Sequence, residues 1–196
     1  MSHSIVLASA STARSRILTG AGIPHITAPM VLNEQAVRDA MADRSGEAIA
    51  LELAKRKALA GSGQHPGSWV IGCDQVLDCE GVFFSRPASI LAARSQLEFL
   101  RGKTHGLCSA VCVAHQQDEA WCHVETPRLT MREFTDGFLD SYIATAGEGL
   151  YSPGAYHLEG LGAALFDKVE GDYFAILGLP LLPLLEWLRK QRAISV

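Results

Sequence analysis

SIVLASASTARSRIL, residues 4–18, is the stretch from which the fold can be predicted. An apolar run at residues 5–8 breaks into small hydroxyl residues and then into a helical pattern. This order predicts a strand, a tight turn and a helix. Ser9, Ser11 and Thr12 are suited to cap the first helical turn. The free N–H groups and the positive dipole end of that turn together form an anion site.

Two arginines strengthen the interpretation of this turn as a phosphate site. Arg14 and Arg16 follow the hydroxyl residues within one helical turn. A guanidinium matches phosphate oxygens well because it presents a planar fork of donors. The alternative is that the hydroxyl residues serve only as helix caps, which is their usual role at a strand-to-helix turn.

Size and composition predict a soluble protein that forms one globular domain over residues 1–196, or one domain with a substantial lobe. The chain has 196 residues, of which 48 % are apolar and 19 % charged, and its net charge is −4. Its mean hydropathy is +0.13 and its pI about 6.0. Non-specific binding to nucleic acid requires clustered Lys and Arg, so the composition argues against a nucleic-acid partner. We expect any anionic ligand to be small and locally bound.

The cysteines and the apolar runs predict a cytoplasmic protein without a membrane partner. The five cysteines lack CxxC spacing, and we expect reduced thiols rather than a metal knuckle. The N-terminus lacks a basic segment followed by an apolar core, and no run of about eighteen apolar residues occurs. The cysteines are Cys73, Cys79, Cys108, Cys112 and Cys122.

The remaining pattern predicts an α/β fold with a mixed sheet, because strands and helices alternate early and hairpins follow. Asp74 interrupts an apolar run, where a carboxylate faces either a site or water at the strand end. The predicted strands are 68–77, 105–114 and 120–129, and hairpin turns are predicted at Glu80-Gly81, 115–119 and 169–173. The predicted helices are 45–61, 89–100, 134–144 and 181–191. The last helix is expected to turn Leu182, Leu185, Trp187 and Leu188 toward the core.

Polar residues that interrupt the apolar runs pair cations with carboxylates. This is the chemistry of a metal–polyphosphate site, in which Mg²⁺ takes one or two carboxylates and phosphate oxygens while Arg, Lys and N–H groups neutralise the remaining charge. The set is Ser9, Ser11, Arg14, Glu34, Lys57, Asp74, Arg86, Lys103 and Glu159.

Six blocks in order make the chain resemble the Maf nucleotide pyrophosphatases, nearly from end to end. They are LASASTARSRIL (7–18), ELAKRKA (52–58), IGCDQVL (71–77), LRGKTH (100–105), GAYHLEGLGAALFDKVEGDYF (154–174) and LGLPL (177–181). The resemblance implies a cytoplasmic enzyme that hydrolyses nucleoside triphosphates to monophosphate and pyrophosphate with Mg²⁺ or Mn²⁺. It also implies an elongated mixed sheet flanked by helices with a central cleft, of the Maf and ITPase type, and a homodimer.

The resemblance also assigns roles to individual residues. Asp74 resembles the family's catalytic acidic residue, which binds metal or activates the attacking water. Ser9 and Arg14, with Ser11 in the same loop, resemble its phosphate-binding residues. The family keeps an acidic residue and two lysines near the phosphates and the metal. In this chain the corresponding residues are Glu34, Lys57 and Arg86.

Two departures from the family pattern concern the site. Arg86-Pro87 stands where the family has Lys-Pro. Arg keeps the positive charge, but its forked guanidinium group is bulkier than the Lys ammonium group. The family reads the base at three positions, which in this chain are Ala13, Gln75 and Glu159. The dTTP/UTP subfamily has Arg, Thr and Gln at these positions. The 7-methyl-GTP subfamily has Trp, Gln and Glu. Two of the three favour 7-methyl-GTP. Ala13 provides no aromatic platform for a methylated purine, and residues 154–156 resemble the pyrimidine subfamily.

Three alternatives remain at this point. A degenerate protein that binds nucleotide without turnover would fit Ala13 and Arg86. A cysteine hydrolase at Cys73 is disfavoured, because the spacing suggests neither a positioned base nor an oxyanion site. His105 either contacts phosphate or simply begins a strand.

Overall fold

The computed structural model describes residues 4–195, which form a mixed α/β fold. Its strands are β1 (Ile5–Leu7), β2 (Ile26–Thr27), β3 (Trp69–Cys79), β4 (Val82–Phe84), β5 (Thr104–His115), β6 (Asp118–Glu125), β7 (Arg128–Met131) and β8 (Phe166–Glu170). These described strands form an eight-stranded sheet of order β2-β1-β3-β5-β7-β8, with β4 on β3 and β6 on β5. β1 runs parallel to β2 and β3, whereas the hairpin strands pair antiparallel. The predicted mixed sheet is confirmed.

Within residues 4–195, every α-helix except α7 begins directly after a residue whose side chain caps it. Ser45, Ser89 and Thr135 each accept a hydrogen bond from the backbone N–H three residues later, which satisfies one free donor of the first turn. The helices are α1 (Thr12–Gly20), α2 (Glu34–Ala40), α3 (Gly46–Gln64), α4 (Ile90–Leu100), α5 (Asp136–Thr145), α6 (Tyr173–Ile176) and α7 (Leu181–Lys190), with short 3-10 turns η1 (Gly147–Tyr151), η2 (Pro153–Ala155) and η3 (Leu161–Leu165).

The described contacts divide the chain into two compact units. The first comprises the chain up to Gln75, Cys108–Glu125 and the chain from Asp172 on. The second comprises Val76–Leu107 and Thr126–Gly171. β3 and β5 therefore contribute residues to both units.

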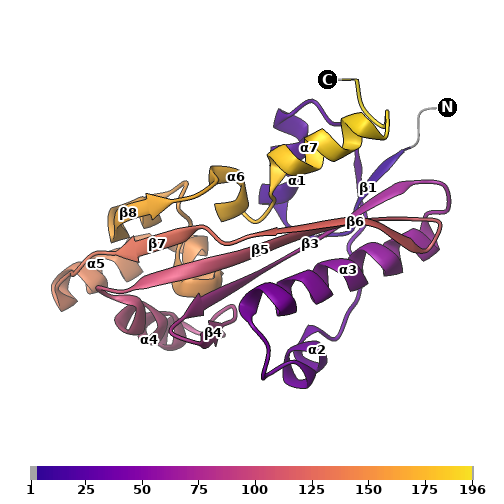
Figure 1. Ribbon diagram of the computed structural model, residues 1–196. Coiled ribbons are helices and arrows are strands. Elements are labelled where there is room, and N and C mark those ends of the chain that lie inside the picture. The colour runs from indigo at the N-terminus through magenta and orange to yellow at the C-terminus, as the bar shows by residue number, and fades with distance from the viewer. Residues whose placement is uncertain (1–3, 196) are drawn as a thin grey trace. The chain divides into compact units, whose positions relative to one another are not determined.

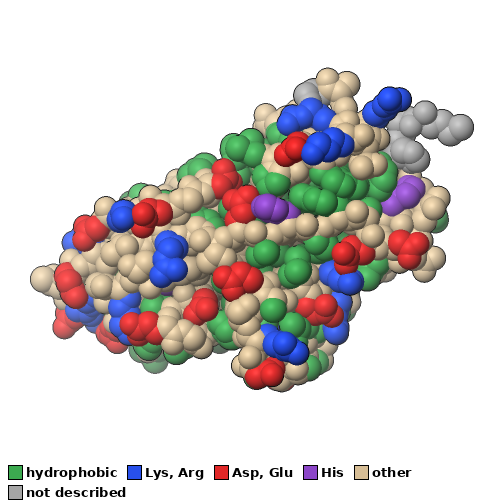
Figure 2. Space-filling model, viewed as in Figure 1, with side chains coloured by type: hydrophobic (Ala, Val, Ile, Leu, Met, Phe, Trp, Pro, Cys, Tyr) green, Lys and Arg blue, Asp and Glu red, His purple; other side chains and the backbone are tan. Residues whose placement is uncertain are grey.

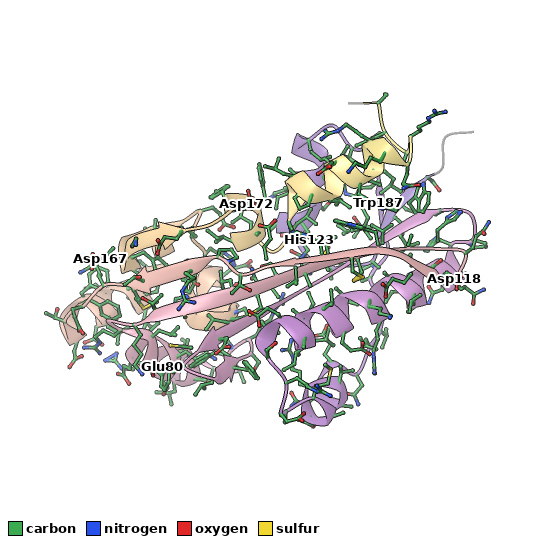
Figure 3. The ribbon with its side chains drawn as sticks, in the orientation of Figure 1. Glu80, Asp118, His123, Asp167, Asp172 and Trp187 are labelled. Atoms are coloured by element: carbon green, nitrogen blue, oxygen red, sulfur yellow. A yellow bond between two sulfur atoms is a disulfide. The ribbon has the colours of Figure 1, made fainter. Side chains whose placement is uncertain are left out.

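Helices cover both faces of the sheet strands in the first unit (Figure 1). On one face, α1 and α7 pack Leu18, Leu184 and Leu188 into the main core with Ile71. Figure 3 shows His123 of β6 on the same side as Trp187 of α7, and Trp121 stacks between their rings. On the other face α3 crosses β3 so closely that a Cβ at Gly72 would lie 2.2 Å from the Ala54 carbonyl oxygen. This close approach brings α3 side chains down onto β3.

The second unit contains the hairpin β3–β4, the paired strands β7 and β8, and helices α4 and α5. His105 of β5 is buried at 1 % exposure, and its Nε2 lies 2.7 Å from the Tyr156 hydroxyl. Phe166 packs against both rings. His105 is therefore a core residue of a strand. Burial lowers its pKa from 6.5 to about 4.

The buried His105 predicts a loss of stability in mild acid. Below pH 6.5 the unfolded chain protonates this residue, whereas the folded protein keeps it neutral down to about pH 4. The unfolded state then binds more protons, so the free energy of unfolding falls as the pH is lowered, by up to about 3 kcal/mol. Urea unfolding between pH 7.5 and 4 will measure this loss. His105→Gln should flatten the profile in that window; an unchanged slope in the variant would contradict the assignment.

Three sequence-based expectations were wrong in detail. In α7, Leu188 is buried as predicted, but Leu182 is 56 % exposed, and the other fully buried residues are Leu181 and Leu184. Leu185 and Trp187 are only partly buried against the core. Residues 169–173 form no hairpin: β8 ends at Glu170, and Asp172 caps α6 by accepting from Ala175 N at 2.8 Å.

The predicted strand 120–129 is two strands. β6 ends at Glu125 and β7 begins at Arg128, so that Pro127, which cannot donate to a ladder, lies between them. β6 pairs with the Ser109–His115 part of β5, whereas β7 pairs with its beginning.

The expectation of five reduced thiols was also wrong for two cysteines. Cys112 and Cys122 form a disulfide, since the antiparallel register of β5 and β6 places them directly opposite each other. Cys73, Cys79 and Cys108 are free and buried.

On the face drawn in Figure 2, acidic and basic side chains are interspersed. No helix within residues 4–195 has the length and apolar character to cross a membrane.

Candidate active site

The turn between β1 and α1 is built by serine hydroxyls. Ser11 is the helix cap, and its side chain accepts from Arg14 N at 3.4 Å. Ser9 is buried, and its hydroxyl accepts from Ser11 N at 3.2 Å. Both serines predicted for a phosphate loop therefore shape it, while Thr12 is already the first helical residue.

Arg14 fixes this loop to the rest of the first unit. Its Nε donates to the Gly178 carbonyl at 2.8 Å, and its Nη1 donates to Ser9 Oγ at 3.1 Å and to the Cys73 carbonyl at 3.0 Å. All three acceptors are neutral, so no carboxylate among them cancels the guanidinium charge. Arg14 thus anchors the loop and keeps a positive charge available to an anion.

Beside this loop, a buried lysine joins two carboxylates. Lys57 Nζ of α3 lies 2.6 Å from Asp74 Oδ1 on β3 and 2.6 Å from Glu34 Oε1 at the start of α2. Asp74 is 4 % exposed and Lys57 is 9 % exposed. The close approach of α3 to β3 explains why a lysine reaches the strand. A buried carboxylate requires such a partner.

The cations also act on Glu34. Burial by itself would raise the pKa of this carboxyl. The hydrogen bond from Lys57 and the charges of Lys57, Arg38 and Arg14 outweigh burial and hold the pKa of Glu34 below its usual value. Glu34 is therefore an anion at neutral pH.

Arg38 completes the cluster, and the sequence analysis missed it. Its Nη2 lies 3.3 Å from Asp74 Oδ2 and 3.9 Å from Glu34 Oε2. The available signal was its position four residues after Glu34 on one helix, which places the two side chains on the same face. With Arg14, Lys57 and Arg38 there are three cations beside two carboxylates.

The two carboxylates suit a divalent metal that takes its remaining ligands from substrate and water. Within residues 4–195 no group of three or more His, Cys, Asp or Glu side chains could hold a metal ion. Asp74 and Glu34 nevertheless converge on one Lys57 ammonium. Mg²⁺ commonly binds through one or two carboxylates plus substrate phosphates, which is the donor set available here.

Two of the three candidate base-reading residues lie in this unit. Gln75 follows Asp74 on β3, and its Nε2 donates to Ser109 Oγ at 2.7 Å and to the carbonyls of Ala175 and Ile176. Its amide nitrogen therefore holds the end of α6. Ala13 is the second residue of α1 and is half-buried.

The other predicted residues belong to the second unit. Arg86 is exposed just after β4, and Glu159 is exposed between η2 and η3. Lys103 lies 2.8 Å from Glu80 and over the Phe99 ring at 3.8 Å. The structure thus brings together, within the first unit, Ser9, Ser11, Arg14, Glu34, Lys57 and Asp74, whereas the amide nitrogen of Gln75 contacts Ser109 and α6.

Cys73 has none of the features of a nucleophile. Its side chain is completely buried, and burial raises the pKa of the thiol to about 11. The reactive form of cysteine is the thiolate. The cysteine hydrolase alternative therefore has no support in the structure.

Known proteins resemble this chain over nearly its whole length. The family described as Maf-like protein matches residues 4–191. A nucleoside triphosphate pyrophosphatase from Paramagnetospirillum magneticum is 50 % identical over 94 % of this chain and 97 % of its own length. A 7-methyl-GTP pyrophosphatase from Brucella abortus is 44 % identical over 100 % of both chains. A solved nucleoside-triphosphatase / dITP/XTP pyrophosphatase from Mycobacterium abscessus aligns over 97 % of this chain and 95 % of its own, with 15 % identity and a TM-score of 0.41.

Proposed function

Because this chain belongs to the Maf family, we propose that it is a nucleoside triphosphate pyrophosphatase. It cleaves the bond between the α and β phosphates and releases a nucleoside monophosphate and pyrophosphate. The observation that carries the proposal is the buried Lys57–Asp74 pair beside the Arg14-anchored serine loop. This arrangement combines a candidate base with cations for a polyphosphate. Full-length relatives named as pyrophosphatases support it.

Asp74 and Glu34 would hold a divalent cation, Mg²⁺ or Mn²⁺. When bound, this ion neutralises charge on the polyphosphate oxygens. The chain's own residues do the positioning. The Ser9–Ser11 loop and Arg14 bind phosphate oxygens, and Lys57 holds the Asp74 carboxylate in place through a hydrogen bond to its Oδ1. Asp74 accepts a proton from the water that attacks the α phosphorus. The reaction requires no covalent intermediate.

The experiment that tests this proposal is pyrophosphate release from a panel of canonical and modified nucleoside triphosphates. Mg²⁺ and Mn²⁺ are each supplied in turn. Pyrophosphate with an equal amount of monophosphate from at least one substrate is the expected result. Nucleotide binding without pyrophosphate release under every condition would instead favour the degenerate binding protein, the alternative suggested by Ala13 and Arg86.

For the base, we propose a preference for a 7-methyl-GTP-like substrate, read by Gln75 and Glu159. A carboxylate at position 159 can accept hydrogen bonds from the N1 and N2 donors of a guanine. The 44 % identity with a protein named 7-methyl-GTP pyrophosphatase supports this choice. Ala13 supplies no aromatic surface, so the preference would rest on hydrogen bonds rather than on stacking.

Glu159→Gln should reduce the preference for 7-methyl-GTP over UTP by about 10-fold or more, the expected loss when a charged hydrogen bond is removed. The ratio of kcat/KM for the two substrates measures this preference. Glu148→Gln, an exposed acidic residue of the same unit, is the matched control. If both variants keep the wild-type ratio, Glu159 does not read the base.

A cytoplasmic location and a homodimer are further parts of the proposal, and both come from the resemblance to the family. Sedimentation velocity of the purified chain distinguishes a dimer of about twice 21.1 kDa from a monomer.

A further inference from the structure

Arg38 closes a ring of four alternating charges. Lys57 joins Glu34 Oε1 and Asp74 Oδ1 at 2.6 Å each, and Arg38 Nη2 approaches the other oxygen of each carboxylate, Asp74 Oδ2 at 3.3 Å and Glu34 Oε2 at 3.9 Å. Both oxygens of Asp74 are therefore occupied by cations. Release of one of these cations would free the full acceptor capacity of that oxygen for a proton or another ligand.

The two cations differ in how firmly they hold Asp74. The Lys57 side chain is 11 % exposed, and it makes two short contacts from the long helix α3. The Arg38 side chain is 21 % exposed, and its contact with Asp74 is longer by 0.7 Å (3.3 against 2.6 Å). Arg38 is the cation that can leave with the smaller change in structure.

The helix that carries Arg38 is lightly held. α2 has seven residues, and Val37 is the only buried side chain within it. Its remaining bonds include the exposed pair Gln35–Asp39 and the cap formed by Asn33. A short element with so little buried apolar surface belongs to the part of a protein that opens most readily.

We propose that Arg38 is a further phosphate-binding residue, which exchanges Asp74 for the triphosphate when substrate binds. A triphosphate offers more negative charge than one carboxylate, and its oxygens suit the guanidinium fork. The exchange frees Asp74 Oδ2 at the moment the substrate arrives. The inference rests on the proposed function, because that function makes the ligand a triphosphate.

The test measures binding of inorganic tripolyphosphate by calorimetry, without metal, so that neither base recognition nor turnover contributes. Arg38→Gln is expected to raise the Kd about 10-fold or more, through loss of a charge-assisted contact. Arg38→Lys keeps the charge without the fork and should give an intermediate Kd. Arg44→Gln is the matched control, since Arg44 is 66 % exposed and contacts only Asp43 among the recorded ion pairs of residues 4–195.

A wild-type Kd in Arg38→Gln, with reduced kcat and unchanged KM, would overturn the proposal and make Arg38 a positioning residue for Asp74. If Arg38→Gln does not fold, Arg38→Lys decides in the same assay, because an unaltered Kd there would also overturn the exchange. The outcome is separable from the proposed function. Arg38-dependent binding in a protein that releases no pyrophosphate contradicts only the proposed activity, whereas Arg38-independent binding in an active enzyme contradicts only this inference.

Discussion

Asp74→Asn is expected to lower kcat by about 10³-fold or more, because an amide cannot accept a proton and general-base catalysis contributes about 10²–10⁴-fold. Asn has nearly the same shape as Asp, and its Oδ1 still accepts the Lys57 hydrogen bond that the structure places at 2.6 Å. The fold should therefore survive. Pyrophosphate release at saturating substrate measures the loss, and the thermal unfolding midpoint verifies the fold.

Asp78→Asn is the control for this change. It lies on the same strand, and its Oδ1 accepts from the Gly81 backbone N–H at 2.9 Å, a bond that Asn also forms. We expect Asp78→Asn to retain nearly full turnover. Wild-type kcat in a folded Asp74→Asn protein would show that another group activates the water.

Lys57→Met is expected to reduce both turnover and stability. It removes the ammonium that lies 2.6 Å from both Asp74 and Glu34 and leaves the two carboxylates with only the longer contacts to Arg38 among the described ion pairs. Breaking a buried ion pair by deleting one member typically costs about 3–5 kcal/mol, because the remaining charge is buried and uncompensated. Urea unfolding measures the change in free energy of unfolding, and the pyrophosphate assay measures turnover.

Lys55→Met is the matched control for Lys57→Met. Lys55 lies on the same helix and pairs with Glu119 at 2.7 Å, but its side chain is 42 % exposed. An exposed pair of this kind contributes little to stability, because water and salt screen it. The double variant Asp74→Asn/Lys57→Met should recover part of the lost stability, since it no longer buries the Asp74 charge. Equal stability of the two lysine variants would mean that Lys57 is not needed to compensate the buried carboxylates.

The sequence predicted the parts of the site that follow from local chemistry. Serines after an apolar run predict a capped helix, and Ser11 is that cap. An aspartate inside an apolar strand was expected to face either a site or water at the strand end, and Asp74 is buried against Lys57. Arg38 was missed because its contact with Asp74 depends on how α2 lies in the first unit, which no local pattern specifies. Its spacing from Glu34 signalled only an ordinary helical ion pair.

Most of the other differences arise because segments that are separate in the sequence pair or pack in the fold. The Cys112–Cys122 disulfide depends on the register of β5 against β6, and the sequence alone does not fix that register. Leu182 seemed buried because the apolar residues of α7 outnumber the positions on its inner face. Gln75 was predicted from the resemblance to read a base, and its amide nitrogen also binds Ser109 and the end of α6, a contact between distant segments.

The most direct test of the account is hydrolysis of a nucleoside triphosphate substrate in ¹⁸O-labelled water, followed by mass spectrometry of the products. The account predicts one ¹⁸O atom in the nucleoside monophosphate and none in the pyrophosphate, because water attacks the α phosphorus. Label in the pyrophosphate, or release of orthophosphate and nucleoside diphosphate, would contradict it.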